Sequence, residues 1–226
     1  MEPSPRIAFA RRIAAHDPTL RVYAILDADT CVRRNLPLLE TVQAWREAGI
    51  QIIQYRDKAA GPDTLRRNAR ALRDIFPQGE AFLILNDHPD LISECDFDGA
   101  HIGQTDITAS EARRHLGPDR ILGVSTHSAD QALAANSTEA DYVAVGPVFA
   151  TSTKANAEQV VGLCGVQAAR AVTTKPLVAI GGIGLGDARS VQTAGADSVA
   201  VVSALLPSSN LAEVKARAQD FLARLK

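Results

Sequence analysis

The sequence predicts a single (β/α)₈ TIM barrel, preceded by a short N-terminal extension. Short apolar runs alternate eight times with amphipathic segments, a pattern typical of a parallel sheet covered by helices. The chain has 226 residues, near the roughly 250 that such a barrel takes. An open doubly wound sheet is the alternative with the same alternation. We therefore expect an extension over residues 1–20 and a catalytic barrel domain over residues 21–226.

The strands are predicted from apolar runs too short for helices and rich in β-branched residues. Such runs suit parallel strands that are buried on both faces. In chain order they are Val22–Leu26, Ile50–Tyr55, Ala81–Leu85, Gly99–Ile102, Ile121–Val124, Tyr142–Val145, Leu177–Ile180 and Ser198–Val202.

The helices between them are predicted from apolar residues at helical spacing. In the second helix, for example, Leu65, Ala69, Leu72 and Phe76 fall on one face. The expected helices cover residues 38–45, 65–76, 89–95, 110–115, 129–135, a segment from about 160, residues 187–194 and residues 211–225.

The N-terminal segment lacks the continuous apolar core of a signal peptide. We expect an extra helix that covers the fold, and a short transit peptide stays an open alternative. We also expect removal of residues 1–18 to leave kcat/KM within about tenfold.

Composition excludes several classes of protein. The net charge of −2 gives no chain-wide basic field for nucleic acid, and no apolar run approaches a membrane span. The three cysteines, at irregular spacing, form neither a disulfide framework nor a zinc pattern. Reduced thiols predict a cytoplasmic protein. The sequence leaves open whether the chain forms a homo-oligomer.

Chemistry in such a barrel lies on the loops that follow the strands. Gly181 and Gly182 follow the seventh strand, and the eighth ends at Val202-Ser203. Loops after strands seven and eight are the usual phosphate site, where glycines allow backbone N–H groups close to an anion. The alternative is a tight turn without a ligand.

Polar residues also end strand two. Because strand side chains alternate, Gln54, Arg56 and Lys58 point the same way, and two cations would converge on anionic oxygens. The alternative is a solvated cluster of charges in a loop.

Two aspartates at neighbouring strand ends predict a site for a hard cation. Asp87 follows strand three and Asp106 follows strand four; few carboxylates plus substrate phosphates suit Mg²⁺. The alternatives are a helix N-cap for Asp87 and a turn residue for Asp106. His101, on strand four, is as compatible with an ordinary buried histidine as with a functional one.

The loops after strands five and six add hydroxyl groups. Ser125 ends strand five, where a helix-capping run is the alternative. The long loop after strand six suits a lid with groups for phosphate oxygens, or else a polar loop without a ligand. It carries Thr151, Ser152 and Thr153 beside Lys154. No nucleophile with an adjacent base stands out.

Taken in order, these motifs resemble the thiamine phosphate synthase family over roughly residues 21–206. One such motif would be weak evidence, but the ordered set is specific. The matching stretches are Gln54–Lys58, Asn86-Asp87, Asp98–Asp106, Gly123–Ser125, Gly146–Phe149, Thr151–Lys154, Ile180–Ile183 and Gly195–Asp197 with Ser203.

The resemblance implies a Mg²⁺-dependent transferase that joins a hydroxymethylpyrimidine diphosphate to a thiazole phosphate and releases diphosphate. It implies that Arg56, Lys58, Lys154 and Ser125 are catalytic, and that Asp87 and Asp106 bind the metal. For the pyrimidine diphosphate it implies Gln54, Arg56, Lys58, Asn86, Ser125 and Lys154. For the thiazole phosphate it implies Thr151, Thr153, Gly182, Val202 and Ser203. Tyr55, Asp57 and Ser152 are further expected to bind substrate.

Three other functions share part of this pattern. A related thiazole tautomerase or regulator needs the thiazole phosphate site but not Arg56, Lys58 and the aspartates. A phosphosugar isomerase needs a strand-end base, for which no further carboxylate is placed. A ligand sensor is the third. One departure from the family is His88, where many relatives have arginine.

Overall fold

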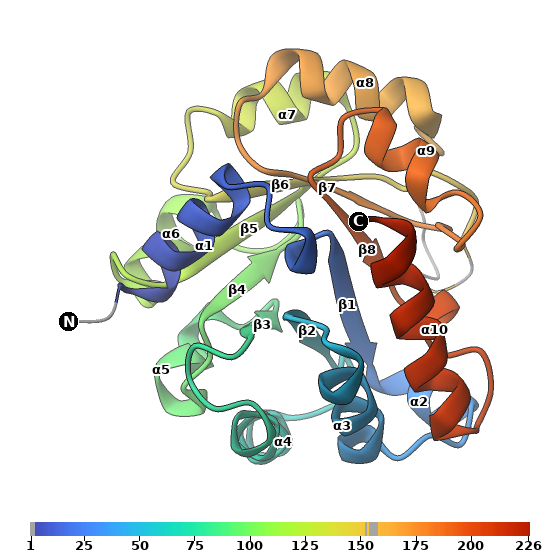
Figure 1. Ribbon diagram of the computed structural model, residues 1–226. Coiled ribbons are helices and arrows are strands. Elements are labelled where there is room, and N and C mark those ends of the chain that lie inside the picture. Colours follow the sequence, from blue (N-terminus) through green and yellow to red (C-terminus); the bar gives the residue numbers. More distant parts are fainter. Residues whose placement is uncertain (1–2, 152, 154–157) are drawn as a thin grey trace.

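The computed structural model describes residues 3–151, 153 and 158–226. It confirms the predicted barrel. Every strand pairs in parallel with its neighbours, and β1 pairs with β8, so the sheet is closed (Figure 1). Closure rules out the open doubly wound sheet. In the described part of the chain, no helix is both long enough and apolar enough to cross a membrane.

The strands match the predicted runs, with shifts at their ends. Some extend into polar residues because the ladder continues there: Asp27 pairs with Arg56, and Asn86 with His101. The observed strands are β1 (Val22–Asp27), β2 (Ile52–Arg56), β3 (Phe82–Asn86), β4 (Gly99–Ile102), β5 (Ile121–Thr126), β6 (Tyr142–Val145), β7 (Leu177–Ile180) and β8 (Ser198–Val201).

The helices also follow the predicted order, with one addition. The short α2 directly follows β1 and was not expected; the Asp27 carboxylate caps it by accepting from the Thr30 N–H at 2.9 Å. The helices are α1 (Pro5–Ala14), α2 (Ala28–Arg33), α3 (Leu38–Ala48), α4 (Pro62–Ile75), α5 (Ile92–Cys95), α6 (Ala109–Leu116), α7 (Ala129–Ala135), α8 (Gly162–Val172), α9 (Ala188–Thr193) and α10 (Leu211–Arg224), with 3₁₀ turns at Pro18–Leu20, Pro89–Leu91 and Ser203–Leu205.

Side-chain alternation divides the core into two layers. On β1, Val22, Ala24 and Leu26 pack outward against the helices, whereas Tyr23 and Ile25 pack inside the barrel. The inner layer is small and holds polar groups among its apolar residues, including Gln54 and His101, which are both buried. These inward polar groups lie toward the carboxyl ends of the strands, where a barrel carries its chemistry.

The N-terminal helix α1 closes the opposite end of the barrel. Phe9 is 3% exposed and belongs to the inner layer. Its ring meets Phe82, the first residue of β3, edge-on at 5.4 Å, and Tyr142 at 5.7 Å between centroids. Figure 1 shows α1 lying across the strands beside β5. The predicted extra helix is thus confirmed. Because it packs against the interior, we expect residues 1–18 to contribute to stability, and the expected effect of their removal on kcat/KM stays a prediction.

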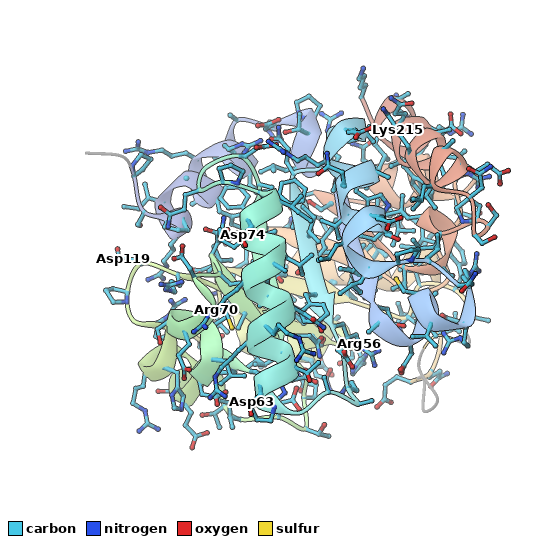
Figure 2. All side chains as sticks on the ribbon, turned by 90° about the horizontal axis from the view of Figure 1, so that it is seen from below. Arg56, Asp63, Arg70, Asp74, Asp119 and Lys215 are labelled. Carbon is cyan, nitrogen blue, oxygen red and sulfur yellow. The ribbon has the colours of Figure 1, made fainter. Side chains whose placement is uncertain are left out.

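Figure 2 separates the two ends of the molecule. Arg56 lies near the start of α4, marked by Asp63, whereas Asp74 marks the far end of that helix. Asp119, whose carbonyl accepts from the Arg6 N–H of α1, lies toward that far end as well. Arg56, a charged residue predicted for the site, therefore lies away from the end that α1 covers.

Candidate active site

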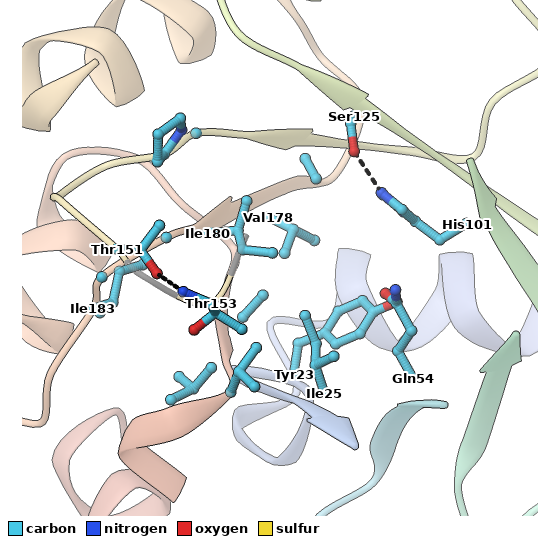
Figure 3. A pocket seen from close by; sticks show the side chains of 18 of the residues that line it. Tyr23, Ile25, Gln54, His101, Ser125, Thr151, Thr153, Val178, Ile180 and Ile183 are labelled. Carbon is cyan, nitrogen blue, oxygen red and sulfur yellow. Dashed lines mark hydrogen bonds between the residues drawn. The ribbon is translucent and has the colours of Figure 1, made fainter. Parts of the chain in front are cut away.

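A cleft opens at the carboxyl ends of the strands. It encloses about 140 Å³ and is open to solvent at its mouth. Figure 3 shows the side chains that converge on it. Of the predicted site residues, the cleft is lined by Gln54, Arg56, Asn86, Ser125, Thr151, Thr153, Gly182, Val202 and Ser203.

The floor of the cleft is a continuous chain of hydrogen bonds between six strands. Gln54 Nε2 donates to Asn86 Oδ1 at 2.7 Å, and the Tyr23 hydroxyl donates to Gln54 Oε1 at 2.8 Å. The Tyr23 and Tyr142 hydroxyl oxygens lie 2.8 Å apart. The hydrogen-bond chain runs from Asn86 to Ser125, and its successive members lie on β3, β2, β1, β6, β4 and β5.

The chain continues through His101. Its Nδ1 lies 3.0 Å from the Tyr142 hydroxyl, and its Nε2 lies 2.9 Å from Ser125 Oγ. The His101 ring also stacks on Tyr142, with centroids 5.5 Å apart and planes 27° apart. His101 is therefore buried and also lines the cleft. It has features of both alternatives drawn from the sequence, an ordinary buried histidine and a functional one.

Burial keeps the two tyrosines neutral. It raises the pKa of Tyr23 well above its ordinary value, and the neighbouring Tyr142 hydroxyl raises it further. Burial also raises the pKa of Tyr142. Each hydroxyl therefore holds one proton at physiological pH, and each can donate one hydrogen bond along the chain.

Gly123 makes the room that Tyr142 needs. The two residues are paired between β5 and β6, and a Cβ at position 123 would lie 2.0 Å from Cζ of the Tyr142 ring. With glycine there, the ring lies against the β5 backbone and reaches His101. The glycine noted before Ser125 in the sequence thus has a packing role.

Arg56 is held by a partner that sequence reasoning missed. Its guanidinium is ion-paired with the Asp27 carboxylate across the β1–β2 register, and the two side chains are only 15% and 2% exposed. The second Asp27 oxygen is occupied by Thr30, through its N–H and its hydroxyl. The pair fixes the orientation of Arg56 at the cleft. The sequence marked this partner only by strand alternation, which places Asp27 on the same inward side as Tyr23 and Ile25.

The two aspartates predicted to bind a metal, Asp87 and Asp106, are not among the residues that line the cleft. Asp87 Oδ2 is 3.0 Å from Lys58 Nζ, and the Asp87 N–H donates to the carbonyl of His101 on the adjacent strand. Asp106 Oδ2 accepts from the Gly103 N–H at 2.7 Å and its side chain is exposed. Among the described residues, no three His, Cys, Asp or Glu side chains gather into a cage for a metal.

The carboxylate oxygens of Asp87 and Asp106 are of the kind that suits Mg²⁺ bound together with a substrate. The ion prefers oxygen ligands, keeps waters, and is usually held by one or two carboxylates plus phosphate oxygens. The partly exposed Asp87 and the exposed Asp106 leave room for those further ligands. A resident metal enclosed by protein alone does not fit.

The loops after β6 and β7 are joined into one wall. Val148 and Phe149 donate from their N–H groups to the carbonyls of Ile180 and Gly181, each at 2.9 Å. Gly182 has φ of +66°, and a Cβ there would lie 2.4 Å from the Ala150 carbonyl oxygen. Glycine is thus required by its backbone conformation and by the close approach of the two loops.

Tyr55 and Asp57, two expected binding residues, do not line the cleft, and neither does Lys58. Tyr55 is fully buried in the outer layer, between barrel and helices, because it alternates with the inward Gln54 and Arg56. Its hydroxyl donates to Asp57 and accepts from Asn68. Asp57 also accepts from the Ala60 N–H, so it shapes the loop before α4. For Tyr55 and Asp57 the structure corrects the expectation of substrate contact.

Two more expected residues, Ser152 and Lys154, lie outside the described residues. In the other direction, sequence reasoning missed several groups that line the cleft. Tyr23 and Tyr142 belong to no sequence motif. Only strand alternation, which turns both side chains into the barrel, could have identified them as cleft residues. The remaining missed polar groups are His127, whose Nδ1 lies 2.6 Å from the Gly146 carbonyl, and Glu158.

Comparison with known proteins agrees with this geometry. A family model described as thiamine monophosphate synthase matches residues 22–205. The thiamine-phosphate synthase of Koribacter versatilis is 42% identical over 205 residues, covering 89% of this chain and 94% of the relative. That of Chloroflexus aurantiacus is 39% identical, covering 87% and 90%.

A solved structure extends the likeness to three dimensions. The thiamine phosphate pyrophosphorylase of Pyrococcus furiosus superimposes with a TM-score of 0.80 at 30% identity, covering 92% of this chain and 96% of that one. This chain therefore belongs to the thiamine monophosphate synthase family.

Proposed function

We propose that this chain is a thiamine-phosphate synthase, a transferase that joins hydroxymethylpyrimidine diphosphate to a thiazole phosphate. The products are thiamine phosphate and diphosphate. The observation that carries the proposal is one cleft with two different anion-binding walls. Arg56 lies on one wall, with Lys58 and Asp87 beside it, and the glycine loop with Thr151 and Ser203 forms the other.

The two walls suit two different phosphates. The loops after β6, β7 and β8 present hydroxyls and backbone at Gly182, which suit a monophosphate. The end of β2 presents two cations, Arg56 and Lys58, which suit the greater charge of a diphosphate. We place the thiazole phosphate at the first wall and the pyrimidine diphosphate at the second.

The chemistry follows from this placement. The bond between the pyrimidine methylene carbon and the diphosphate oxygen breaks, and its electron pair leaves with diphosphate. The lone pair of the thiazole nitrogen then forms the new C–N bond. Arg56 and Lys58 stabilise the charge that develops on the departing diphosphate, an effect typically worth about 3 kcal/mol for one well-placed donor. Lys154 is proposed for the same role.

Asp87 and Asp106 would hold Mg²⁺, which when bound supplies positive charge to the diphosphate oxygens. In its absence, the Lys58–Asp87 ion pair, at 3.0 Å, keeps each charge compensated. A tautomerase or a regulator would have no use for this charged wall, so its presence favours the synthase.

The test is incubation of the full chain with both substrates, with and without Mg²⁺, followed by mass spectrometry of the products. We expect thiamine phosphate only with both substrates and the metal. Asp87→Ala should abolish most turnover with the circular dichroism spectrum retained. Asp74→Ala, an exposed aspartate at the far end of α4, is the matched control. Isomerised thiazole phosphate without coupling, detected by proton NMR because its mass is unchanged, would instead identify a tautomerase, and no change by either method would favour a sensor.

A further inference from the structure

The hydrogen-bond chain on the cleft floor has a direction. Each member has a limited number of protons: one on each tyrosine hydroxyl, none on an amide oxygen, and one ring proton on a neutral histidine. When one end of such a chain is fixed as an acceptor, every later bond is fixed in turn.

The fixed end is Gln54. Its Nε2 donates to Asn86, so its Oε1 faces Tyr23 and can only accept. Tyr23 donates its single hydroxyl proton in that hydrogen bond. In the 2.8 Å contact between the two hydroxyls, the donor must therefore be Tyr142.

The same count continues to the other end. Because Tyr142 donates to Tyr23, its oxygen faces His101 Nδ1 as an acceptor, at 3.0 Å. In the neutral form of His101, the single ring proton is then on Nδ1. Nε2 is left with a lone pair, and the 2.9 Å contact with Ser125 is a hydrogen bond donated by the serine hydroxyl.

We propose that Tyr142 is a positioning residue, which with Tyr23 selects the Nδ1–H tautomer of His101 and thereby turns the Ser125 proton away from the cleft. The inference goes beyond the proposed function, since it concerns the proton positions in the free protein. Figure 3 shows the Ser125–His101 contact and the Tyr23–Gln54 pair at the floor of the cleft.

This direction has a chemical consequence for ligands, which does rest on the proposed function. With its proton committed to His101, Ser125 Oγ offers only lone pairs to the cleft. It therefore suits an N–H donor or an electron-poor carbon and not a phosphate oxygen. Ser125 would face the aminopyrimidine and its methylene group, where positive charge develops as diphosphate leaves.

The stacking contact makes the arrangement rigid. Gly123 lets the Tyr142 ring lie 5.5 Å from the His101 ring, and Phe9 packs on the same tyrosine at 5.7 Å. Rotation of Tyr142 away from His101 would therefore require these packed groups to move. The direction of the chain is thus held by packing as well as by hydrogen bonds.

The test is nitrogen NMR of the full, ligand-free chain with ¹⁵N-labelled histidine. The chain has five histidines, and the His101 signals are assigned by their loss in His101→Asn. We expect a proton on Nδ1 and none on Nε2 in the wild type. In Tyr142→Phe the His101 Nδ1–H loses its acceptor. In Tyr23→Phe the Tyr142 hydroxyl loses the acceptor that fixes the direction of its proton. Both variants should convert the single tautomer into a mixture.

Tyr55→Phe is the matched control. This tyrosine is equally buried, and its hydroxyl is also hydrogen-bonded, but it belongs to the outer layer and not to the chain. Its His101 signals should equal those of the wild type. A wild-type proton on Nε2, or on both nitrogens, would overturn the inference, as would a tautomer unchanged in both tyrosine variants. These results come from the free protein, so they stand or fall separately from the synthase assay.

Discussion

The buried Asp27–Arg56 pair gives the sharpest prediction for stability. The Asp27 side chain is 2% exposed and the Arg56 side chain 15%, so removal of either partner leaves a charge in a largely dry environment. Loss of one partner from such a pair costs about 4 kcal/mol, and loss of the Asp27 cap on α2 costs about 1 kcal/mol more. For a chain of this length, that total corresponds to a fall in Tm of roughly 10–20 °C.

A double-mutant cycle separates the pair from the cap. Asp27→Ala, Arg56→Met and the double variant are unfolded in urea and followed by circular dichroism. The cap is lost in the Asp27→Ala background with or without Arg56, so its contribution cancels. We expect a coupling free energy of about 3 kcal/mol between the two side chains.

The matched control is Asp63–Arg66 on the surface of α4. It joins the same two residue types with a separation of 2.9 Å, but the aspartate side chain is 99% exposed. Solvent screens such a pair, so its coupling should be close to zero. If the Asp27–Arg56 coupling were as small as that of the surface pair, burial would not be what makes Arg56 a fixed feature of the cleft, and this reasoning would fail.

Three further outcomes follow from the packing. Phe9→Ala should lower the free energy of unfolding by about 3–5 kcal/mol, measured by urea denaturation, because a buried aromatic side chain is lost; a change below 1 kcal/mol would support a dispensable α1. Gly123→Ala should cost about 1–3 kcal/mol and shift the near-ultraviolet circular dichroism, since its Cβ meets the Tyr142 ring; an unchanged spectrum would contradict that clash. With a thiol reagent at pH 8, exposed Cys164 should react first, while burial raises the pKa of the Cys31 thiol to about 12 and keeps it inert until unfolding; equal rates would refute this order.

Much of the site could be predicted because it depends on local pattern. In a closed parallel barrel the strand ends meet at one rim, so Arg56, Ser125 and Gly182 were expected together from their positions alone. They do line one cleft. Alternation along a strand is equally local, and applied strictly to β2 it would have turned Tyr55 outward beside the inward Gln54 and Arg56.

The sequence by itself therefore determined the barrel, the order of its elements and the rim on which the charged groups lie. Periodicity and strand ends carry that information within a few residues. Only the tertiary structure decided which inward side chains touch. Tyr23 and Tyr142 are 119 positions apart, and their contact exists because the barrel closes β1 near β6 across its interior. Asp27 likewise meets Arg56 only through the register of two strands. Contacts across the barrel depend on closure, register and side-chain volume together, and no local pattern records that combination.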